Sequence, residues 1–489
     1  MAAYVLKGKE LCWDKYLWDK SEGVRLRIHR PEEKNVVIEQ EKNIALDSFI
    51  QIIQAGDMYR MYYAAHNRAG GELSGGVFYL AESSDGINFT KPDFGMFEYE
   101  GSKNNNIYFT EDRFVDNFTV HYDENPACPK EEKYKALSLI FINNSEGCST
   151  DLGLYVSPDG INFSFKKKLP VKGVFDSMNI IFWDKKDKTY KLYIRDFHDK
   201  DGNDVEYIPD DAVVEPWIRD VRLVISKDLE TFSKPERIKF QEGAEDIELY
   251  VSQVMKYPGT ELYFGLPTRY KNRAADIKNF DYLPKWEYRQ KFLDEGNRQG
   301  SALTDCVAMT SRDGLHFDRF DSEAFIKPGI EATENWGYGD GYVSHGFALT
   351  PIEGNPDKKE LSFFIKKGRT DSNCKIVRMT TRLDGIISWR GDFEGGYLLT
   401  KPLLIHGDGM SINFSTSSLG SINIKICDDD GNEIEGYDSK TVFGDSHDRP
   451  VDFEKPLSAL KGKEVRIKFF FKDCDLYSFE FKETAGCNT

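Results

Sequence analysis

The chain has 489 residues, of which 13% are aromatic, and a formal net charge of −17 at pH 7. A protein this acidic is not expected to bind nucleic acid or an anionic membrane surface. The length allows two or three domains, and the aromatic content (34 Phe and 25 Tyr) favours strands over helices, so we expect an all-β fold.

The first 40 residues contain two short patterns typical of strands, residues 11–14 and 24–28. The chain begins without an apolar run of signal-peptide length, and no stretch approaches 18 apolar residues, so we expect a cytoplasmic protein without a membrane span. The eight cysteines are far apart and lack metal-binding spacing, which predicts free thiols and no metal site. Residues 1–40 are predicted to form an N-terminal extension that packs on the next domain.

A short turn pattern recurs from residue 41 to about residue 390. Ser84-Asp85-Gly86-Ile87-Asn88-Phe89 returns as Pro158-Asp159-Gly160-Ile161-Asn162-Phe163, and three more copies follow with variations. The aspartates of the five copies stand at positions 85, 159, 228, 313 and 384. Asp accepts hydrogen bonds from the backbone two residues on, and Gly accepts a positive φ, so each copy predicts a tight turn between strands.

Each period also opens on an acidic residue that heads an apolar strand. These residues are Asp47, Asp116, Asp176, Glu248 and Asp340. Each period therefore predicts four antiparallel strands, and five such units in series predict a five-bladed β-propeller over residues 41–390. Closing such a ring often takes a strand from a chain terminus, which the N-terminal extension would supply. The longest insertions, residues 197–219 and 270–304, are polar loops that we expect to carry function.

The turn pattern stops at about residue 390, and a different series of alternating strands begins. Its clearest members are residues 410–414, 421–426 and 465–471. Such a run of short strands predicts a β-sandwich over residues 391–489, which would serve as an accessory domain.

The first strand of each propeller blade lines the central axis, so the five acidic residues are expected to converge at one mouth of the ring. Burying several carboxylates together is costly unless one is protonated or otherwise compensated. Acids in such settings acquire the different proton affinities that general acid and general base roles require.

This pattern resembles the five-bladed propeller glycosidases, the clan of invertases, fructanases and arabinanases (glycoside hydrolase families 32, 43 and 68). The resemblance rests on Asp47, Asp176 and Glu248, at the heads of the first, third and fourth blades, and on their strand contexts. The Asn-Asp-Pro-Asn, Arg-Asp-Pro and Glu-Cys motifs of invertases are absent, so the similarity is to the superfamily. The chain also resembles a group of uncharacterised bacterial glycosidase-like proteins.

The resemblance implies a cofactor-free glycosidase that cleaves a small oligosaccharide, with furanosides such as fructosides or arabinosides among the candidates. Glu248 would be the general acid, with Asp246 and Glu245 as competitors for this role. Asp47 would be the nucleophile of a retaining enzyme or the base that activates water in an inverting one. Asp176 would orient the sugar and keep Glu248 protonated.

Further residues are candidates for substrate binding. They are Asp116, Arg195, Arg269, Trp336 and Asp340. The two acids would bind sugar hydroxyl groups, the arginines end strands near the insertions, and the tryptophan would stack on a sugar ring, with surface pairing or packing as the alternative roles. His345 is expected to be a satisfied core histidine, with contact to a water or an ion in the channel as the alternative.

Two other functions fit the same pattern. A glycoside phosphorylase needs one proton donor and a cationic cradle for phosphate, which Arg195, Arg269 and Arg298 would supply. A non-catalytic propeller would bind carbohydrate at the same mouth without turnover. In every case the expected partner is a small carbohydrate.

Overall fold

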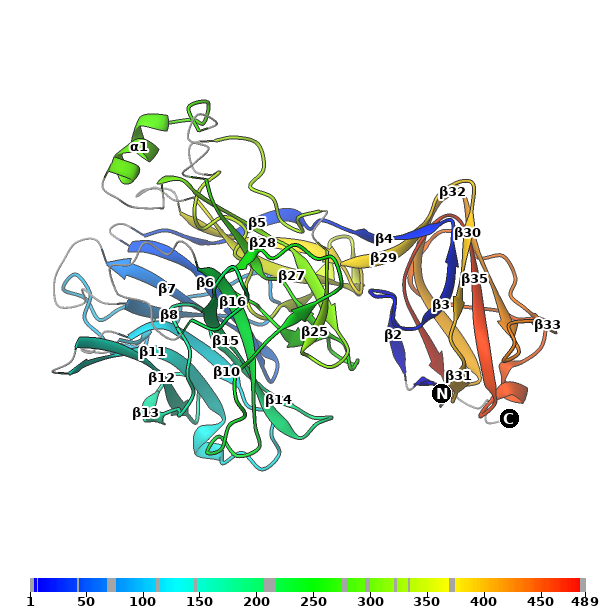
Figure 1. Cartoon of the computed structure of the whole chain (residues 1–489), viewed down its shortest axis with the longest axis horizontal. Coiled ribbons are helices and arrows are strands. Elements are labelled where there is room, and N and C mark those ends of the chain that lie inside the picture. The colour runs from blue at the N-terminus through cyan, green and yellow to red at the C-terminus, as the bar shows by residue number, and fades with distance from the viewer. Residues whose placement is uncertain are drawn as a thin grey trace.

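The structure, a computed structural model, describes residues 4–6, 8–41, 44–67, 76–110, 115–144, 147–205, 217–273, 280–294, 300–320, 323–332, 335–368 and 374–483. These residues are almost entirely β-structure with a single α-helix, α1 (Trp286–Asp294), which confirms the predicted all-β class. None of the helices in these ranges has the length and apolar character needed to cross a membrane. Figure 1 shows a larger body joined to a smaller one, and the smaller one holds both chain termini.

The larger body contains sheets that follow one another along the chain (Figure 1). The first three are four-stranded and antiparallel throughout. Their strands are β6 (Ile44–Ala55), β7 (Met58–Asn67), β8 (Gly76–Ser83) and β9 (Ile107–Phe109); β10 (Val115–Tyr122), β11 (Tyr134–Asn144), β12 (Gly147–Ser157) and β13 (Ser164–Lys168); and β14 (Ile180–Asp184), β15 (Thr189–His198), β16 (Ile218–Ser226) and β17 (Glu236–Arg237).

The fourth blade is split into two parts. One part pairs β19 (Glu248–Leu249), β22 (Thr268–Asn272) and β23 (Ala302–Cys306), and the other pairs β18 (Lys239–Phe240), β25 (His316–Phe320), β24 (Ala308–Ser311), β21 (Tyr263–Gly265) and β20 (Met255–Lys256). The break lies at Pro267, which has no backbone N–H to continue the ladder. The Val307 N–H donates to the Pro267 carbonyl at 3.1 Å and joins the two parts.

The fifth blade is closed by a strand from the start of the chain. It consists of β26 (Ala348–Ile352), β27 (Asn355–Lys367), β28 (Lys375–Arg382) and β5 (Glu32–Glu39). Because β5 pairs antiparallel with β28, the last blade is completed by residues that lie some 340 positions earlier in sequence.

Hydrogen bonds link the inner segments of successive blades all the way round the ring. They run from Val120 N to Gln51 Oε1 (3.4 Å), between His121 Nε2 and Asn179 O (3.4 Å), from Ser177 Oγ to Tyr250 O (2.7 Å), from Gln253 Nε2 to Val343 O (2.5 Å) and from His345 N to Ile50 O (2.8 Å). Five blades closed in this way form a five-bladed β-propeller.

The recurring Asp-Gly turns bind neighbouring strands through a shared hydrogen-bond pattern. In the first copy, the N–H groups of Ile87 and Asn88 both donate to Asp85 Oδ1 at 2.8 Å. Burial alone would raise the pKa of Asp85, but these backbone donors outweigh it and lower the pKa to about 2. In the second copy, Tyr62 of the first blade donates to the Gly160 carbonyl at 3.1 Å, so this turn also fastens two blades together.

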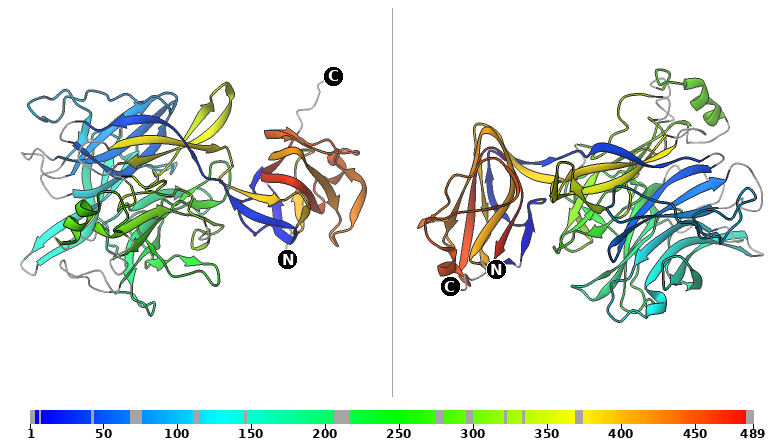
Figure 2. Two further views of the ribbon diagram at one scale, coloured as in Figure 1. Left: turned by 90° about the horizontal axis from the view of Figure 1, so that it is seen from above. Right: turned by 180° about the vertical axis from the view of Figure 1, so that it is seen from behind.

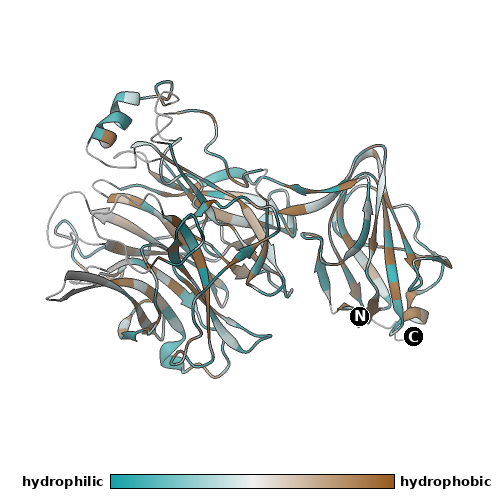
Figure 3. Cartoon of the chain, in the orientation of Figure 1, coloured by the Kyte–Doolittle hydropathy of each residue, from teal (hydrophilic) through white to brown (hydrophobic). Residues whose placement is uncertain are grey.

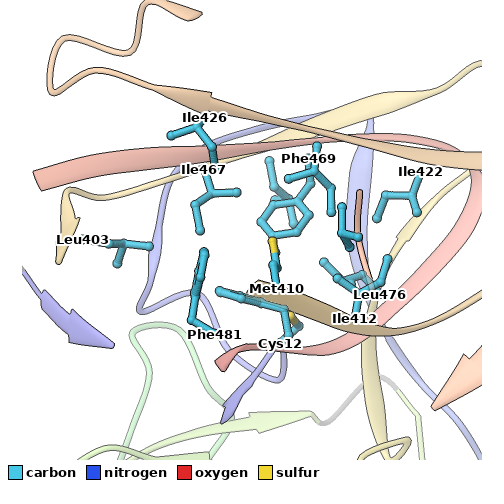
Figure 4. Packing of buried hydrophobic residues seen from close by; sticks show 14 of the residues in the cluster. Cys12, Leu403, Met410, Ile412, Ile422, Ile426, Ile467, Phe469, Leu476 and Phe481 are labelled. Carbon is cyan, nitrogen blue, oxygen red and sulfur yellow. The ribbon is translucent and has the colours of Figure 1, made fainter. Parts of the chain in front are cut away.

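The smaller body is one hydrogen-bonded network of 11 strands drawn from both ends of the chain. The strands are β1 (Tyr4–Leu6), β2 (Lys9–Leu11), β3 (Trp18–Glu22), β4 (Val24–Ile28), β29 (Ile387–Gly391), β30 (Gly396–Thr400), β31 (Leu403–Ile405), β32 (Gly409–Cys427), β33 (Glu433–Asp438), β34 (Asp445–Pro450) and β35 (Glu464–Lys482). Figure 4 shows side chains such as Met410, Phe469 and Phe481 meeting in its core, and Figure 3 shows hydrophobic and hydrophilic residues interspersed along its strands.

This pairing does not show the two separate sheets of the predicted sandwich. The strands β32 and β35 have 19 residues each, and they pair along most of their length with register shifts near Asn413 and Thr416. The first 40 residues are also divided differently from the expectation, because β1–β4 belong to this body and β5 to the propeller.

Asp384, from the last Asp-Gly turn, joins the two bodies. Its carboxylate forms an ion pair with Lys9 Nζ (2.9 Å) and accepts hydrogen bonds from the hydroxyl groups of Tyr257 and Ser478, both at 2.8 Å. Only 1% of the Asp384 surface is exposed. Together with β4 and β29, which run from one body to the other in Figure 2, this network fixes the smaller body against the propeller.

Candidate active site

Two buried arginines connect the acidic residues of the third and fourth blades. Arg195 Nη1, at the end of β15, donates to Asp176 Oδ2 at 3.0 Å and also contacts the Asp176 carbonyl. Arg219, near the start of β16, forms an ion pair with Glu248 on β19. Both guanidinium groups lie over the Tyr250 ring, 5.3 and 5.6 Å from its centre, so the two acid–arginine pairs belong to one cluster.

Asp47 reaches this cluster from the first blade. It lines a small cavity together with Asn117, whose Nδ2 donates to Asp176 Oδ1 at 3.3 Å. The structure therefore places Asp47 beside Asn117, the partner of Asp176, and places the arginine partners of Asp176 and Glu248 over the same Tyr250 ring.

Local irregularities in the inner strands create this arrangement. The ladder between β6 and β7 shifts register between Leu46 and Ile50, and that between β10 and β11 shifts between Asp116 and Thr119. Such bulges re-aim side chains at the ends of strands. The apolar strand that Asp176 is expected to head begins only at Ile180 as β14, because the Asn179 side chain donates to the backbone carbonyls of Phe175 and Ser177.

The carboxylates of the cluster face solvent and the cations lie behind them. The Asp176 side chain is 52% exposed and that of Glu248 24%, whereas the side chains of Arg195 and Arg219 are 4% and 2% exposed. Two carboxylates within reach of a ligand, held in place by buried guanidinium groups, provide hydrogen-bond acceptors with fixed positions.

Aromatic side chains form the wall beside the fourth and fifth blades. Tyr250, Tyr270, Tyr338 and Tyr342 contact one another with ring centres 5.6 to 6.3 Å apart. Arg219 lies against this wall, with its guanidinium carbon 4.4 Å from the centre of the Tyr270 ring. Tyr250, Tyr270 and Tyr342 are at most 4% exposed, so these rings support the acid–arginine pairs from behind and present no open face to a sugar.

The other predicted binding residues have separate surroundings. Arg269 is engaged by Asp305 on the neighbouring strand through two hydrogen bonds of 2.8 and 2.6 Å. Asp340 accepts a hydrogen bond from Gly337 N (3.1 Å), and the Trp336 indole donates to the Gly329 carbonyl (2.9 Å), so both stabilise the loop before the fifth blade. The Asp116 side chain and Arg298 lie outside the described residues.

Asp246 and His198 form a second polar group next to Glu248. His198 bonds Asp220 through Nδ1 and Asp246 through Nε2, both at 2.9 Å. Burial lowers the pKa of His198, but these two carboxylates outweigh burial and raise it. Burial raises the pKa of the nearby Asp196 to about 6, with Asp220 adding to the rise against the opposing charge of Arg222.

His345 lies on the inner segment of the fifth blade. Desolvation lowers its pKa to about 4, and its ring packs against that of His121 with ring centres 5.4 Å apart. The residue is only partly buried, and its Nδ1 has no hydrogen-bond partner in the described part of the chain, so the prediction of a satisfied core histidine is not met at this nitrogen. Within the same ranges, no three His, Cys, Asp or Glu residues gather in a way that could hold a metal ion.

Sequence analysis did not identify Arg219, Asn117 or Tyr250 as site residues. Arg219 stands at the end of a predicted insertion, and only its pairing with Phe197 across β15 and β16 places it beside Glu248. Asn117 follows an acidic residue that heads a strand, and its positive φ of 57° is the local feature that turns its amide toward Asp176.

No family model matches the chain, and no curated protein matches its sequence. Solved structures match it at low identity. A glycoside hydrolase family 43 arabinoxylan arabinofuranohydrolase from Bacillus subtilis, in complex with cellotetraose, is 13% identical over 90% of this chain and 96% of its own, with a TM-score of 0.37. The family 32 β-fructofuranosidase of Bombyx mori is 11% identical over 94% of each chain, also with a TM-score of 0.37.

A third structure comes from glycoside hydrolase family 130, described as mannoside phosphorylases that contain glycoside hydrolases targeting β-1,2 mannosidic linkages. It is 13% identical over 72% of this chain and 94% of its own, with a TM-score of 0.39. The structural neighbours of this chain are thus five-bladed propeller glycoside hydrolases and phosphorylases at low sequence identity.

Proposed function

We propose that the protein is a glycoside hydrolase that cleaves a small oligosaccharide at this mouth of the propeller. The observation that carries the proposal is the meeting of Asp47, Asp176 and Glu248 around two buried arginines, with Asp176 and Glu248 facing solvent. Glycosidic bonds are cleaved by a pair of carboxyl groups that flank the bond, and this cluster supplies such a pair from different blades.

Each acid has a role that its contacts support. The Arg219 contact uses Glu248 Oε2, and Oε1 has no partner among the described residues, so Oε1 is the oxygen that would protonate the leaving group. For Glu248 to carry this proton, the bound substrate would have to loosen the Arg219 contact. Asp47 would attack the anomeric carbon or activate water, and Asp176, held by Arg195 and Asn117, would accept a hydrogen bond from a sugar hydroxyl.

The test uses carboxylate-to-amide changes with matched controls. Asp47→Asn and Glu248→Gln should each lower kcat/KM on unactivated alkyl glycosides at least about 100-fold, which is the usual contribution of a general acid or base. Two control substitutions should leave kcat/KM unchanged. Asp57→Asn lies in the turn at the far end of the hairpin that contains Asp47, and Glu242→Gln lies at an exposed position. Wild-type rates in both amide variants would reject the proposal.

A glycoside phosphorylase is the second candidate, and one observation favours it. Arg195 Nε and both Nε and Nη2 of Arg219 are buried donors without a hydrogen-bond partner among the described residues. Guanidinium donors of this kind suit a phosphate group. Phosphate added to the assay would then yield a sugar 1-phosphate, detected by phosphorus NMR, whereas a hydrolase yields the free sugar.

The third candidate, a carbohydrate-binding propeller without catalysis, predicts a different result. Asp47→Asn and Glu248→Gln would then leave ligand affinity intact, and the wild-type protein would turn over no glycoside. A cytoplasmic location stays a prediction of the sequence, and it would favour short imported sugars over polymers.

A further inference from the structure

An open cavity beside the fifth blade has a volume of about 590 Å³. It is lined by the ends of β5 and β27, the start of β28, and described residues between Ile326 and Gly341. This volume is within the range of about 300–1,000 Å³ that small-molecule sites usually occupy. The cavity lined by Asp47 and Asn117 has a volume of only about 10 Å³, which is too small for a sugar unit.

The cavity begins next to the carboxylate cluster. Asp340 and Gly341, which lead into the inner segment of the fifth blade, belong to its lining. The adjoining Gly339 packs against Ser48, the neighbour of Asp47: a Cβ on Gly339 would lie 3.3 Å from Ser48 Oγ and 4.0 Å from Lys366 Nζ. The Lys366 ammonium group therefore stands where the cavity meets the first blade.

The walls of the cavity are held by hydrogen bonds. Gln40 and Cys374 exchange two hydrogen bonds of 3.0 Å, which join the ends of β5 and β28. Across the cavity, Asn335 Nδ2 donates to the carbonyl groups of Pro328 and Ile330, and Arg289 from α1 donates to the Asn335 carbonyl at 2.7 Å. These hydrogen bonds hold the described parts of the cavity walls in place.

Positive charge gathers in this lining. Four lysines contribute, and the acids among the lining residues are two, Glu39 and Asp340. The lysines are Lys327, Lys366, Lys367 and Lys375. Lys367 pairs with Glu33, while the side chains of the other three form no ion pair or hydrogen bond with a residue that the structure describes.

The register of the sheet places several of these charges side by side. Lys375 on β28 stands directly opposite Lys367 on β27 and, on its other side, opposite Glu39 on β5. Lys367 is neutralised by Glu33, so the positive charge left in the lining comes from Lys327, Lys366 and Lys375. A local excess of lysine in a protein with a net charge of −17 also concentrates anions at this point.

We propose that this cavity binds a sugar unit that carries an anionic group, either a carboxylate or a phosphate or sulfate ester. Lys366 and Lys375 contact the anion, and the sugar continues past Asp340 toward Asp47 and Glu248. The carbohydrate nature of the ligand rests on the proposed function, whereas its charge rests on the lysines alone. The substrate class is thus an acidic oligosaccharide.

The test is a set of calorimetric titrations of the full chain with D-glucuronate, glucose 6-phosphate, glucose and inorganic phosphate. We expect one of the two anionic sugars to bind at least about tenfold more tightly than glucose, and which one binds identifies a carboxylate or an ester. Raising the salt from 50 to 300 mM should weaken this binding. The proposal would be overturned if D-glucuronate and glucose 6-phosphate bound no more tightly than glucose. It would also be overturned if inorganic phosphate bound as tightly as both of these anionic sugars.

Substitution of the lining lysines tests whether the anionic sugar binds in this cavity. Lys366→Gln and Lys375→Gln should each weaken the anionic sugar at least about fivefold and leave glucose unchanged. Lys103→Gln, an exposed lysine near the outermost strand of the first blade, removes the same charge and should have no effect. The proposal would be overturned if both cavity variants unfolded at the same temperature as wild type and bound the anionic sugar with unchanged affinity.

The same titrations on Glu248→Gln separate this inference from the proposed function. If anionic sugars bind this variant and wild type alike but wild type cleaves no glycoside, the cavity assignment stands and the hydrolase proposal fails. If wild type cleaves neutral glycosides and no anionic sugar is preferred, the hydrolase proposal stands and the cavity assignment fails.

Discussion

Replacing Asp384 should weaken the connection between the propeller and the smaller body. In Asp384→Ala the hydroxyl groups of Tyr257 and Ser478 lose a buried acceptor, and Lys9, which is partly exposed, loses its ion pair. Removing one partner of a buried ion pair costs about 3–5 kcal/mol. The positive φ of 58° at Asp384 adds about 1 kcal/mol for alanine, whereas asparagine tolerates it. We therefore expect a loss of about 5 kcal/mol for alanine and about 2 kcal/mol for asparagine, which keeps one acceptor oxygen.

Urea unfolding followed by tryptophan fluorescence measures this loss, because the Trp13 indole donates to the Asp384 carbonyl at 2.9 Å. Asp392→Asn is the matched control: Asp392 forms ion pairs with Arg25 and Arg390 but is half exposed, so its change should stay within about 1 kcal/mol. An unfolding midpoint of Asp384→Ala equal to that of Asp392→Asn would refute the view that this buried network holds the two bodies together.

Three further predictions concern the site and the blades. Arg219→Met should lower kcat/KM about tenfold or more, because Glu248 loses the group that positions it. Arg219→Lys should restore part of the rate. Wild-type kinetics in a folded Arg219→Met protein would show that the ion pair has no role in catalysis. Burial raises the pKa of Asp196 to about 6, so wild type loses stability as this carboxyl group ionises between about pH 4 and pH 6. Asp196→Asn does not ionise, so its free energy of unfolding relative to wild type should rise by up to about 3 kcal/mol across this window, measured by urea unfolding at each pH. A difference that does not change with pH would contradict the assignment. Gly160→Ala should destabilise the protein by about 1–3 kcal/mol in thermal unfolding, because φ is 77° and the new Cβ would lie 2.6 Å from the Tyr62 hydroxyl. Gly56→Ala is the control for backbone strain alone, because φ is 62° there and no atom lies within 4 Å of the new Cβ. Equal losses of stability in the two variants would show that the contact with Tyr62 has no effect.

The ring of blades is predictable from sequence because each Asp-Gly turn is a local structure. The side chain of Asp85 binds backbone groups two and three residues on, so the same few residues produce the same turn wherever they recur. Asp47, Asp176 and Glu248 follow the same period at the heads of three inner strands. Their placement at one mouth of the ring therefore follows from the repeat rather than from any single motif, whereas Asp340 stabilises a loop instead.

The division of the N-terminal segment is not predictable in the same way, because its partners are distant in sequence. Lys9 on β2 pairs in register with Glu480 on β35, and Val24 on β4 pairs with Gly391 on β29. The short strands have no local signal that distinguishes one sheet from the other. Similarly, Arg219 becomes a neighbour of Glu248 only through the pairing of β16 with β15 and the approach of β19.

The most direct test of the central claim is the dependence of hydrolysis on the leaving group. If Glu248 is the proton donor, Glu248→Gln should lose hydrolysis of unactivated alkyl glycosides yet retain most of the rate on 2,4-dinitrophenyl glycosides, whose leaving group needs no proton. Asp47→Asn should lose both activities, since attack at the anomeric carbon is needed for either substrate. Equal losses on both substrates in Glu248→Gln, or full activity in Asp47→Asn, would contradict the assigned roles.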